Sequence, residues 1–467
     1  MSYDDLHIEY ERLKSENEYL RKMIFGAQTE RHAVTEVDSS QLNLFGTYAP
    51  LEEDKIETES ISYERKKKKH AGRNKLPQHL PVEEITIEPE ADTTELKKIG
   101  EEITESLKYT PASLVVLRII RPKYVKKNQE EILIAPMPNR AIHKCIAEPS
   151  LLSYIMVNKF VDHQPFYRQI QAFKRDYDWE LSSSTVNDWF VACCTLMEPI
   201  YNLMVDRIKQ SNYIQVDESP IKVLESENKK QTHQGYQWVY HSPADQTIVF
   251  NYRKGRGMHG PKEFLQDYQG YLQCDGYSVY DKLGRQSGIK LVGCLVHARR
   301  YFHQALDNDP GKANYALKIF KEIYDENREW KELDAEEITK KRKAYLLPKL
   351  KALKVWCEEE GIICPPRSPI GKAMKYYLNQ YDKLIQVVND GILELDNNLI
   401  ENKIRPLALG RKNYLFAGNH KAGQRIAMMY SFFATCKVKN VNPAKWFKQT
   451  LDALADPEFE NIKLLLP

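Results

Sequence analysis

The spacing of hydrophobic positions changes several times along the chain, and each change predicts a different element. The first apolar positions repeat at intervals of four and three residues, which is typical of a coiled-coil helix. Its members are Leu6, Tyr10, Leu13, Asn17, Leu20 and Ile24. Leucine at d with one Asn at a favours a parallel dimer, although a helix docked on its own domain fits the same pattern. We predict a self-associating coiled-coil helix over residues 1–30.

Residues 31–80 are polar and predict a basic linker with little hydrophobic core. The segment 65–75 within it carries seven cations and no acid. Such a run binds phosphates without regard to base sequence, and a solvated linker explains it equally well. The cations assigned to DNA here are Lys66, Lys67, Lys68, Lys69 and Arg73.

Residues 81–145 contain short apolar runs, such as 113–120, and predict a small β-rich module. Residues 146–210 change to a helical pattern, with two helices joined by a short turn before a third that Ser182, Ser183 and Ser184 cap. This arrangement is typical of a helix-turn-helix DNA-binding region. Most helical hairpins do not bind DNA, but Arg168 and Lys174 on the second helix favour that role.

Residues 211–310 have the order strand, strand, strand, helix, strand, strand. A meander that leads into a crossover predicts a mixed sheet. Residues 311–380 are rich in Lys and Glu and predict a helical insertion, residues 381–454 return to helices of the core, and 455–467 form a C-terminal tail. The chain is therefore predicted to be a multidomain, mixed α/β protein.

The composition narrows the class of protein. The 467 residues are 42% hydrophobic and 28% charged, a balance typical of a globular protein, and no apolar run is long enough to span a bilayer. The acidic N-terminus lacks the pattern of a secretory signal, so we predict a cytoplasmic, nucleoid-associated protein without a membrane partner. The net charge of +3 favours no class by itself.

Eight cysteines are scattered along the chain without a C-x-x-C pair. This spacing predicts buried reduced thiols and makes a zinc site improbable. Cys357 and Cys364 are the one weak candidate for a pair.

Three acids fall where separate elements can bring them together. Asp217 ends the strand-like run 213–217, Asp275 ends the run 271–275, and Glu401 follows a helix cap at 396–398 that includes Asn398. Each acid alone is more typical of a turn or a cap. Together with basic segments they favour a site for two Mg²⁺ or Mn²⁺ ions, with Asp217 as the bridging ligand.

Further polar side chains lie near these acids in the sequence. Those that can clamp phosphates are Arg299, Arg300, Arg405, Arg411 and Lys412. Arg405 can instead form an ion pair with Glu401 four residues earlier. His297 either positions DNA or is a satisfied histidine at a strand-to-helix turn.

The loop 255–260 matches the G-x-G-x-x-G fingerprint of dinucleotide-binding proteins and precedes Asp275 by the expected interval. Three meander strands precede the loop, and no second βαβ unit follows it. A flexible basic loop near DNA is the favoured interpretation, and an oxidoreductase is a distant alternative.

Four segments resemble the catalytic core of insertion-sequence family 66 transposases: VDESP at 216–220, LQCDGYSVYDKL at 272–283, GCLVHARRYF at 293–302 and the stretch 396–418. The linker KKKHAGRNKLPQHLP and the helix-turn-helix segment also resemble that family. The resemblance implies a ribonuclease-H-like, retroviral-integrase-like core and a DDE triad, which falls on Asp217, Asp275 and Glu401. The family commonly has a cysteine-bearing zinc module, whereas residues 84–130 contain no cysteine.

The function predicted from the residues and this resemblance is metal-dependent cleavage of the ends of an insertion sequence and strand transfer into target DNA. The predicted partners are element-end and target DNA, a second copy in a homodimer or larger synaptic assembly, and small accessory proteins. The alternatives are a nuclease that does not join strands and a non-catalytic DNA-binding repressor.

Overall fold

The computed structural model describes residues 139–143, 145–225, 232–285 and 288–467, with shorter stretches at 114–117, 119–120, 123–125 and 132–134 and scattered positions between 7 and 17. The chain forms two compact units, Met1–Ala27 with Arg121–Pro467, and Gln28–Ile120. The fold and the site below belong to the first unit. The predicted linker 31–80, with Lys66, Lys67, Lys68, Lys69 and Arg73, lies outside the described residues.

The predictions for the region before residue 146 are confirmed only in part. The described positions between His7 and Asn17 are helical and exposed, as expected for the helix at 1–30, and its dimerisation stays a prediction. Strands β1 (Lys123–Val125) and β2 (Ile132–Ile134) form an antiparallel hairpin inside the predicted β-rich module. The strand predicted at 113–120 is wrong for its described residues, which are exposed and irregular, because an apolar run forms a strand only when another strand pairs with it.

Helices α2 (Pro149–Phe160), α3 (Phe166–Tyr177) and α4 (Ser183–Gln210) follow in the order predicted for the helix-turn-helix region. Ser182 Oγ accepts the Thr185 N–H at 3.1 Å and caps α4, as predicted. The buried face of α4 packs against strand β5 (Thr247–Arg253) and helix α13 (His420–Val438). The third helix is therefore part of the main core as well as of the predicted DNA-binding region.

Lys159 of α2 lies among aromatic rings. Its Nζ is 3.7 Å from the ring centroid of Phe166 and 5.7 Å from those of Phe160 and Tyr414. Burial lowers the pKa of Lys159 to about 8, because the rings replace the hydration of the ammonium only in part.

Replacement of Lys159 by Met is expected to raise the free energy of unfolding at pH 7 by about 1–3 kcal/mol, since one pKa unit corresponds to about 1.4 kcal/mol. The pKa of Lys159 in the folded protein, about 8, lies below the ordinary value of 10.5. The free energy of unfolding of the wild type therefore rises as the pH increases between these two values, and its difference from the variant becomes smaller. Urea unfolding at neutral and alkaline pH measures the difference, with Lys445→Met as the exposed control. Equal stability of the two proteins at pH 7 would contradict the expectation.

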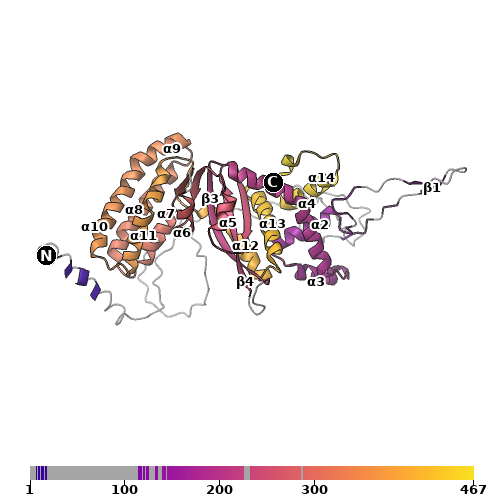
Figure 1. Cartoon of the computed structure of the whole chain (residues 1–467), viewed down its shortest axis with the longest axis horizontal. Helices are drawn as coiled ribbons and strands as arrows, with labels where there is room; N and C mark the ends of the chain where they lie inside the picture. The colour runs from indigo at the N-terminus through magenta and orange to yellow at the C-terminus, as the bar shows by residue number, and fades with distance from the viewer. Residues whose placement is uncertain are drawn as a thin grey trace, which may run out of the picture. The chain divides into compact units, whose positions relative to one another are not determined.

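A five-stranded sheet carries the candidate site (Figure 1). Its other strands are β3 (Tyr213–Val223), β4 (His233–Ser242), β6 (Gly270–Gln273) and β7 (Ile289–Val292), and the order across the sheet is β5-β4-β3-β6-β7. Strands β3, β4 and β5 form an antiparallel meander, whereas β6 and β7 run parallel to β3. The predicted mixed sheet is confirmed.

The connections agree with the predicted order, with two differences. Helix α5 (His259–Phe264) precedes β6 as expected, but α6 (Ser278–Leu283) between β6 and β7 was not expected. The last predicted strand of this region is short: β7 ends at Val292, and helix α7 (Leu295–Gln304) begins three residues later.

Helix α13 protects the edge strand β5. The hydroxyls of Ser431 and Thr435 accept the backbone N–H groups of Phe250 and Ile248 at 2.8 and 3.0 Å. An unpaired strand edge invites pairing with other chains. Hydroxyl groups at these two positions therefore explain why a mostly apolar, buried helix retains polar residues.

The predicted helical insertion is confirmed as helical. It comprises α8 (Pro310–Glu329), α9 (Ala335–Lys341), the π-helical turn η1 (Arg342–Leu346), α10 (Leu347–Ile363) and α11 (Pro369–Leu384), followed by the 3₁₀ turn η2 (Ile385–Val388). Phe320 and Tyr377 are fully buried in its core, to which Phe302 of α7 also belongs. Figure 1 shows these orange helices beside the sheet. The insertion therefore supports α7 and the β7 side of the sheet.

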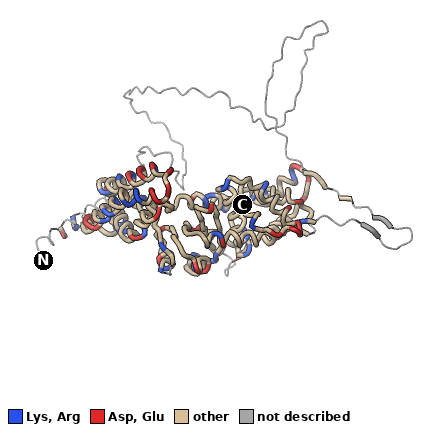
Figure 2. The backbone as a smooth tube through the Cα atoms, turned by 90° about the horizontal axis from the view of Figure 1, so that it is seen from above, with Lys and Arg blue, Asp and Glu red and all other residues tan. Residues whose placement is uncertain are grey.

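Three further elements complete the described chain, namely α12 (Asn398–Tyr414), α14 (Pro443–Ala455) and the 3₁₀ turn η3 (Ile462–Leu465). All eight cysteines are buried and free, including Cys357 and Cys364. Within the described part of the chain, no helix is long and apolar enough to cross a membrane. Figure 2 shows Lys and Arg interspersed with Asp and Glu along the backbone, so binding of a polyanion would depend on local groups of cations.

Candidate active site

Two similar pentapeptides place two of the predicted acids side by side. Residues 213–217 read YIQVD and residues 271–275 read YLQCD. Strands β3 and β6 pair in parallel with Tyr213 opposite Tyr271 and Gln215 opposite Gln273. Because the two segments are in register, Asp217 and Asp275 follow at the same level of the sheet.

The prediction that Asp217 ends a strand is wrong. Strand β3 continues to Val223 and pairs with β4 over its whole length beyond Gln215. Pro220 is tolerated in this extension because β6 ends at Gln273 and leaves the other side of β3 without a partner strand there. Asp217 thus lies within the strand and opposite Val239 of β4, which fixes its carboxylate more firmly than a strand end would.

The segment that leads to Glu401 is held by amide side chains of the sheet. Gln215 Nε2 donates to the Asp396 carbonyl at 3.2 Å, and Gln273 Nε2 donates to the Glu394 carbonyl at 2.8 Å. Asn397 Nδ2 donates to the Val216 carbonyl at 3.1 Å. The same two glutamines that precede the aspartates therefore position the start of α12.

The predicted helix cap at 396–398 is confirmed in its location. Asp396 Oδ1 accepts the Asn398 N–H at 2.9 Å, and α12 begins at Asn398. Glu401 lies in the first turn of α12, where a negative charge also interacts favourably with the helix dipole.

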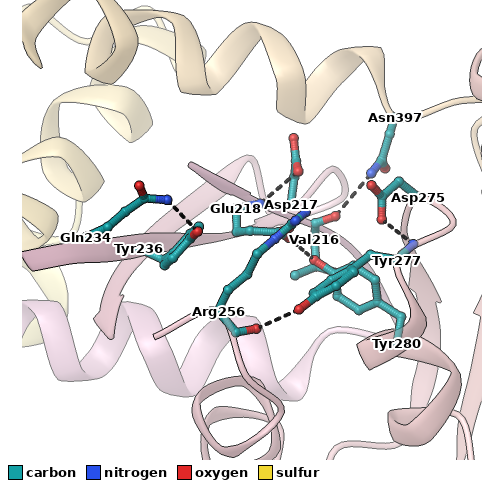
Figure 3. A network of polar contacts seen from close by, with 10 residues as sticks. All are labelled: Val216, Asp217, Glu218, Gln234, Tyr236, Arg256, Asp275, Tyr277, Tyr280 and Asn397. Atoms are coloured by element: carbon teal, nitrogen blue, oxygen red, sulfur yellow. Dashed lines mark hydrogen bonds and ion pairs between the residues drawn. The ribbon is translucent and has the colours of Figure 1, made fainter. Parts of the chain in front are cut away.

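The charges of the other two acids act on Asp217. Burial raises the pKa of Asp217 well above its ordinary value, and the neighbouring carboxylates of Glu218, Asp275 and Glu401 raise it further. Figure 3 shows Asp217 directed away from the side chains of Glu218, Arg256 and Tyr280, and towards the helix that follows Asn397. The arrangement has an excess of negative charge that a cation would relieve.

Helix α7 brings two more groups to Glu401. His297 Nε2 and an Arg300 guanidinium nitrogen each lie 3.9 Å from a Glu401 oxygen. Burial lowers the pKa of His297, and within the described residues its Nδ1 is buried without a hydrogen-bond partner. Glu401 thus makes its ionic contacts with α7 and not with Arg405 of its own helix.

Glu218, next to Asp217, anchors the glycine-containing loop on the opposite side of β3 (Figure 3). Its side chain is 2% exposed, accepts Arg256 Nε at 2.7 Å and accepts the Tyr280 hydroxyl at 2.7 Å. The Arg256 guanidinium stacks 4.0 Å from the Tyr277 ring, and the Tyr277 N–H donates to Asp275 Oδ1 at 2.9 Å. The loop is therefore fixed to the sheet, in contrast to the flexible loop that the sequence suggested.

Among the described residues, the predicted DNA-binding cations fall on three helices. Arg168 and Lys174 are exposed on α3, where Lys174 pairs with Glu180 at 2.6 Å. Arg300 is exposed on α7, and Arg299 is half-buried beside it. The remaining three lie on α12, namely Arg405, Arg411 and Lys412.

One of these α12 cations has an intramolecular role. Arg411 donates to Ser219 Oγ at 2.8 Å and to the Pro220 carbonyl at 2.6 Å, which ties α12 to β3. Arg405 and Lys412 are exposed. A role of these residues in DNA binding stays a prediction.

Several residues of the site were missed by reasoning from the sequence. The glutamines Gln215 and Gln273 had a detectable signal, since the pattern Tyr-x-Gln-x-Asp occurs twice. Glu218, Arg256 and Tyr280 had none, because their partners lie 38 and 62 residues apart in sequence.

The donor set is suited to a divalent cation. Carboxylate oxygens are the ligands that Mg²⁺ and Mn²⁺ prefer. In the described part of the chain, no three His, Cys, Asp or Glu side chains are already gathered as a metal site.

Comparison with known proteins identifies the family. A model described as "Transposase IS66 family" matches residues 144–425. A model for "Transposase C of IS166 homeodomain" matches 12–85, and one for "zinc-finger binding domain of transposase IS66" matches 90–125, a segment without cysteine or histidine.

Two relatives that match most of the chain come from Sinorhizobium fredii. The uncharacterized protein y4jD is 29% identical over 97% of this chain and 94% of its own length. The uncharacterized protein y4qI is 29% identical over 89% of this chain and 81% of its own length. Since the core model covers more than half of the sequence, the chain belongs to the IS66 family of transposases.

Proposed function

We propose that this chain is a DDE transposase that cleaves the ends of an insertion sequence and joins them to target DNA. The observation that supports this most directly is the placement of its acids. Asp217 lies two residues after Gln215 on β3, and Asp275 lies two residues after Gln273, where the parallel strand β6 ends. The charge of Glu401 reaches Asp217 from a third element. Three elements far apart in sequence thus bring carboxylates to one region.

We assign the sheet to the ribonuclease-H-like class. Three antiparallel strands followed by two strands parallel to the first, in the order β5-β4-β3-β6-β7, support this assignment. The acids also emerge where this class of core is expected to carry them, on the first strand and after the fourth strand in chain order.

Asp217, Asp275 and Glu401 would hold two Mg²⁺ or Mn²⁺ ions, with Asp217 as the shared ligand. The fit rests on oxygen donors alone and on the raised pKa of Asp217, which marks a site short of positive charge. When bound, two such ions supply stabilisation of the attacking and leaving oxygens in phosphodiester displacement.

The other side chains would position DNA and the third acid. Arg300 lies 3.9 Å from Glu401 and is exposed, so it can reach both that carboxylate and a phosphate. Arg405 and Lys412 are exposed on α12, and Arg168 is exposed on α3. These cations would form the phosphate contacts of the bound end.

The assembly is proposed to contain two copies so that two ends meet, with the helix at 1–30 as the contact between them. Zinc is not assigned to the segment 90–125, because it offers neither thiolate nor imidazole. Small accessory proteins are compatible with the proposal.

The experiment is a donor-plasmid assay. A marker flanked by the ends of the element is supplied with wild type or Asp275→Asn, and new junctions are sequenced. Junctions with wild type alone are the expected result. Cleaved but unjoined ends would favour the nuclease, and end binding without cleavage would favour the repressor.

A further inference from the structure

The connection between α12 and α13 holds two apolar side chains away from the core. Leu415 is 61% exposed and Phe416 is 41% exposed. Leu224, at the end of β3, is 48% exposed and donates its N–H to the Ala417 carbonyl at 2.9 Å. We call Leu415 and Phe416 the apolar tip.

The backbone of the tip is strained and firmly held. Leu415 has φ 66° and ψ −43°, and the Phe416 N–H donates to the Tyr414 carbonyl at 2.8 Å, which makes a γ-turn of the rare left-handed kind. The next residue, Ala417, donates to the Lys222 carbonyl at 2.8 Å. Glycine adopts this backbone conformation at a lower conformational cost than leucine does.

The tip follows the far end of α12, the helix that carries Glu401 in its first turn. Along β3 and α12, Asp217 and Glu401 mark the end at the candidate site. The β-bridge between Val223 and Ala417 marks the opposite end. Six residues of a β-strand span about 20 Å, and fourteen residues of an α-helix span about the same length. This distance corresponds to about six base pairs of duplex DNA.

The exposed surface between these ends suits a polyanion. Arg405, Leu409 and Lys412 recur at intervals of three or four residues, so they share one exposed face of α12, and the apolar tip follows directly after the helix ends at Tyr414. Lys222 and Lys421 are exposed beside the tip. The one acid described there, Glu225, accepts the His420 N–H at 3.0 Å.

The predicted DNA-binding helices adjoin the same end of α12. Arg168 of α3 donates to Asn413 Oδ1 at 3.4 Å, and Lys159 of α2 lies 5.7 Å from the Tyr414 ring. The tip is therefore continuous with the face of α3 that exposes Arg168. Cations around an exposed apolar residue are typical of proteins that insert a side chain between bases.

We propose that Leu415 and Phe416 form a wedge that enters a base step of the bound element end, about six base pairs from the cleaved phosphodiester. The wedge separates the bases and bends the duplex, so that its phosphates follow α12 towards Glu401. This inference rests on the proposed function, which supplies the DNA. The strained turn keeps the wedge extended before DNA arrives.

The first test measures base unstacking with the full-length protein. A duplex that copies the element end carries 2-aminopurine at successive positions, and binding is measured in Ca²⁺ to prevent cleavage. A fluorescence increase centred about six base pairs from the cleavage point is expected for wild type. Its loss is expected for Phe416→Ser, while Leu464→Ser, which alters a side chain that is 74% exposed, keeps it.

A second variant separates the wedge from a structural role. Leu415→Gly removes the side chain and relieves the positive φ, so its Tm is expected to rise by about 2 °C while unstacking falls. A variant that lost unstacking and stability together would overturn the wedge in favour of a packing role.

Cleavage assays distinguish this inference from the proposed function. Phe416→Ser is expected to cut intact ends about 10- to 100-fold more slowly, and unpaired bases placed at the wedge position should restore the rate. Asp275→Asn should not respond to unpaired bases. Normal cleavage by Phe416→Ser would overturn the proposed wedge but not the proposed transposase activity. If wild type unstacked the bases but never cleaved the DNA, the proposed transposase activity would be overturned and the wedge would stand.

The alternative binding partner of the apolar tip is a second copy of the chain. Sedimentation of wild type and Phe416→Ser without DNA is expected to give the same oligomeric state. A change in that state on substitution would assign the tip to a protein interface and overturn the proposal, as would equal unstacking by both proteins.

Discussion

Asp217→Asn is expected to abolish strand transfer while making the metal-free protein more stable. Loss of the shared ligand should lower the rate of junction formation by at least about 1000-fold, because several kcal/mol of charge stabilisation depend on it. The same change removes a buried charge that repels Glu218, Asp275 and Glu401, so the free energy of unfolding should rise by about 1–2 kcal/mol.

The two effects have separate measurements. Junction sequencing reports strand transfer, and thermal unfolding in chelator reports stability. Because the pKa of Asp217 is raised in the folded state, the folded wild type favours the protonated acid. The stability advantage of Asp217→Asn is therefore present near neutral pH and lost in acid. Mg²⁺ should raise the Tm of wild type and leave the variant unchanged, since ligand binding stabilises the folded state.

Asp452→Asn is the matched control, because Asp452 is half-exposed and pairs with Lys448 at 2.6 Å on α14. It should alter stability by no more than about 0.5 kcal/mol and leave junctions intact. Normal strand transfer by Asp217→Asn would refute the assignment of the triad. DNA binding should persist in both variants, because it depends on separate cations.

Arg342→Met is expected to cause the largest loss of stability, about 3–5 kcal/mol. Arg342 is 3% exposed and lies in the π-helical turn of the insertion. Its guanidinium donates to Asn327 Oδ1 at 2.9 Å and to the carbonyls of Val387 and Leu393 at 2.9 and 2.7 Å. Methionine fills part of the space but leaves these buried acceptors without a donor.

The same substitution should impair catalysis through Glu401. The carbonyls that Arg342 holds belong to the segment after α11, and this segment continues to Glu394 and Asn397 at the start of α12. We expect urea unfolding at a lower midpoint together with slower strand transfer. The control is Arg328→Met, since Arg328 is 68% exposed and pairs with Asp325 at 3.2 Å. A variant as stable as this control would show that the insertion does not support the site.

Local features of the chain could be predicted because they depend on neighbouring residues. The cap at Ser182, the helical insertion and the strand order from Tyr213 to Val292 follow from side-chain hydrogen bonds and spacing within a few residues. Errors occurred where a partner elsewhere decides the outcome. Strand β3 passes Asp217 because β4 pairs with it, and the apolar run at 113–120 has described residues outside any strand.

The sequence by itself determined the types of element, the three candidate acids and the resemblance to a family. The repeated Tyr-x-Gln-x-Asp pattern even contained the register that aligns Asp217 with Asp275. Tertiary structure alone decided that Glu401 approaches them, because Gln215 reaches the Asp396 carbonyl across 181 residues. It also decided that Glu218 accepts a hydrogen bond from Arg256 and that the Leu415 side chain is exposed. Contacts between distant residues depend on how the elements pack, and local spacing does not encode that packing.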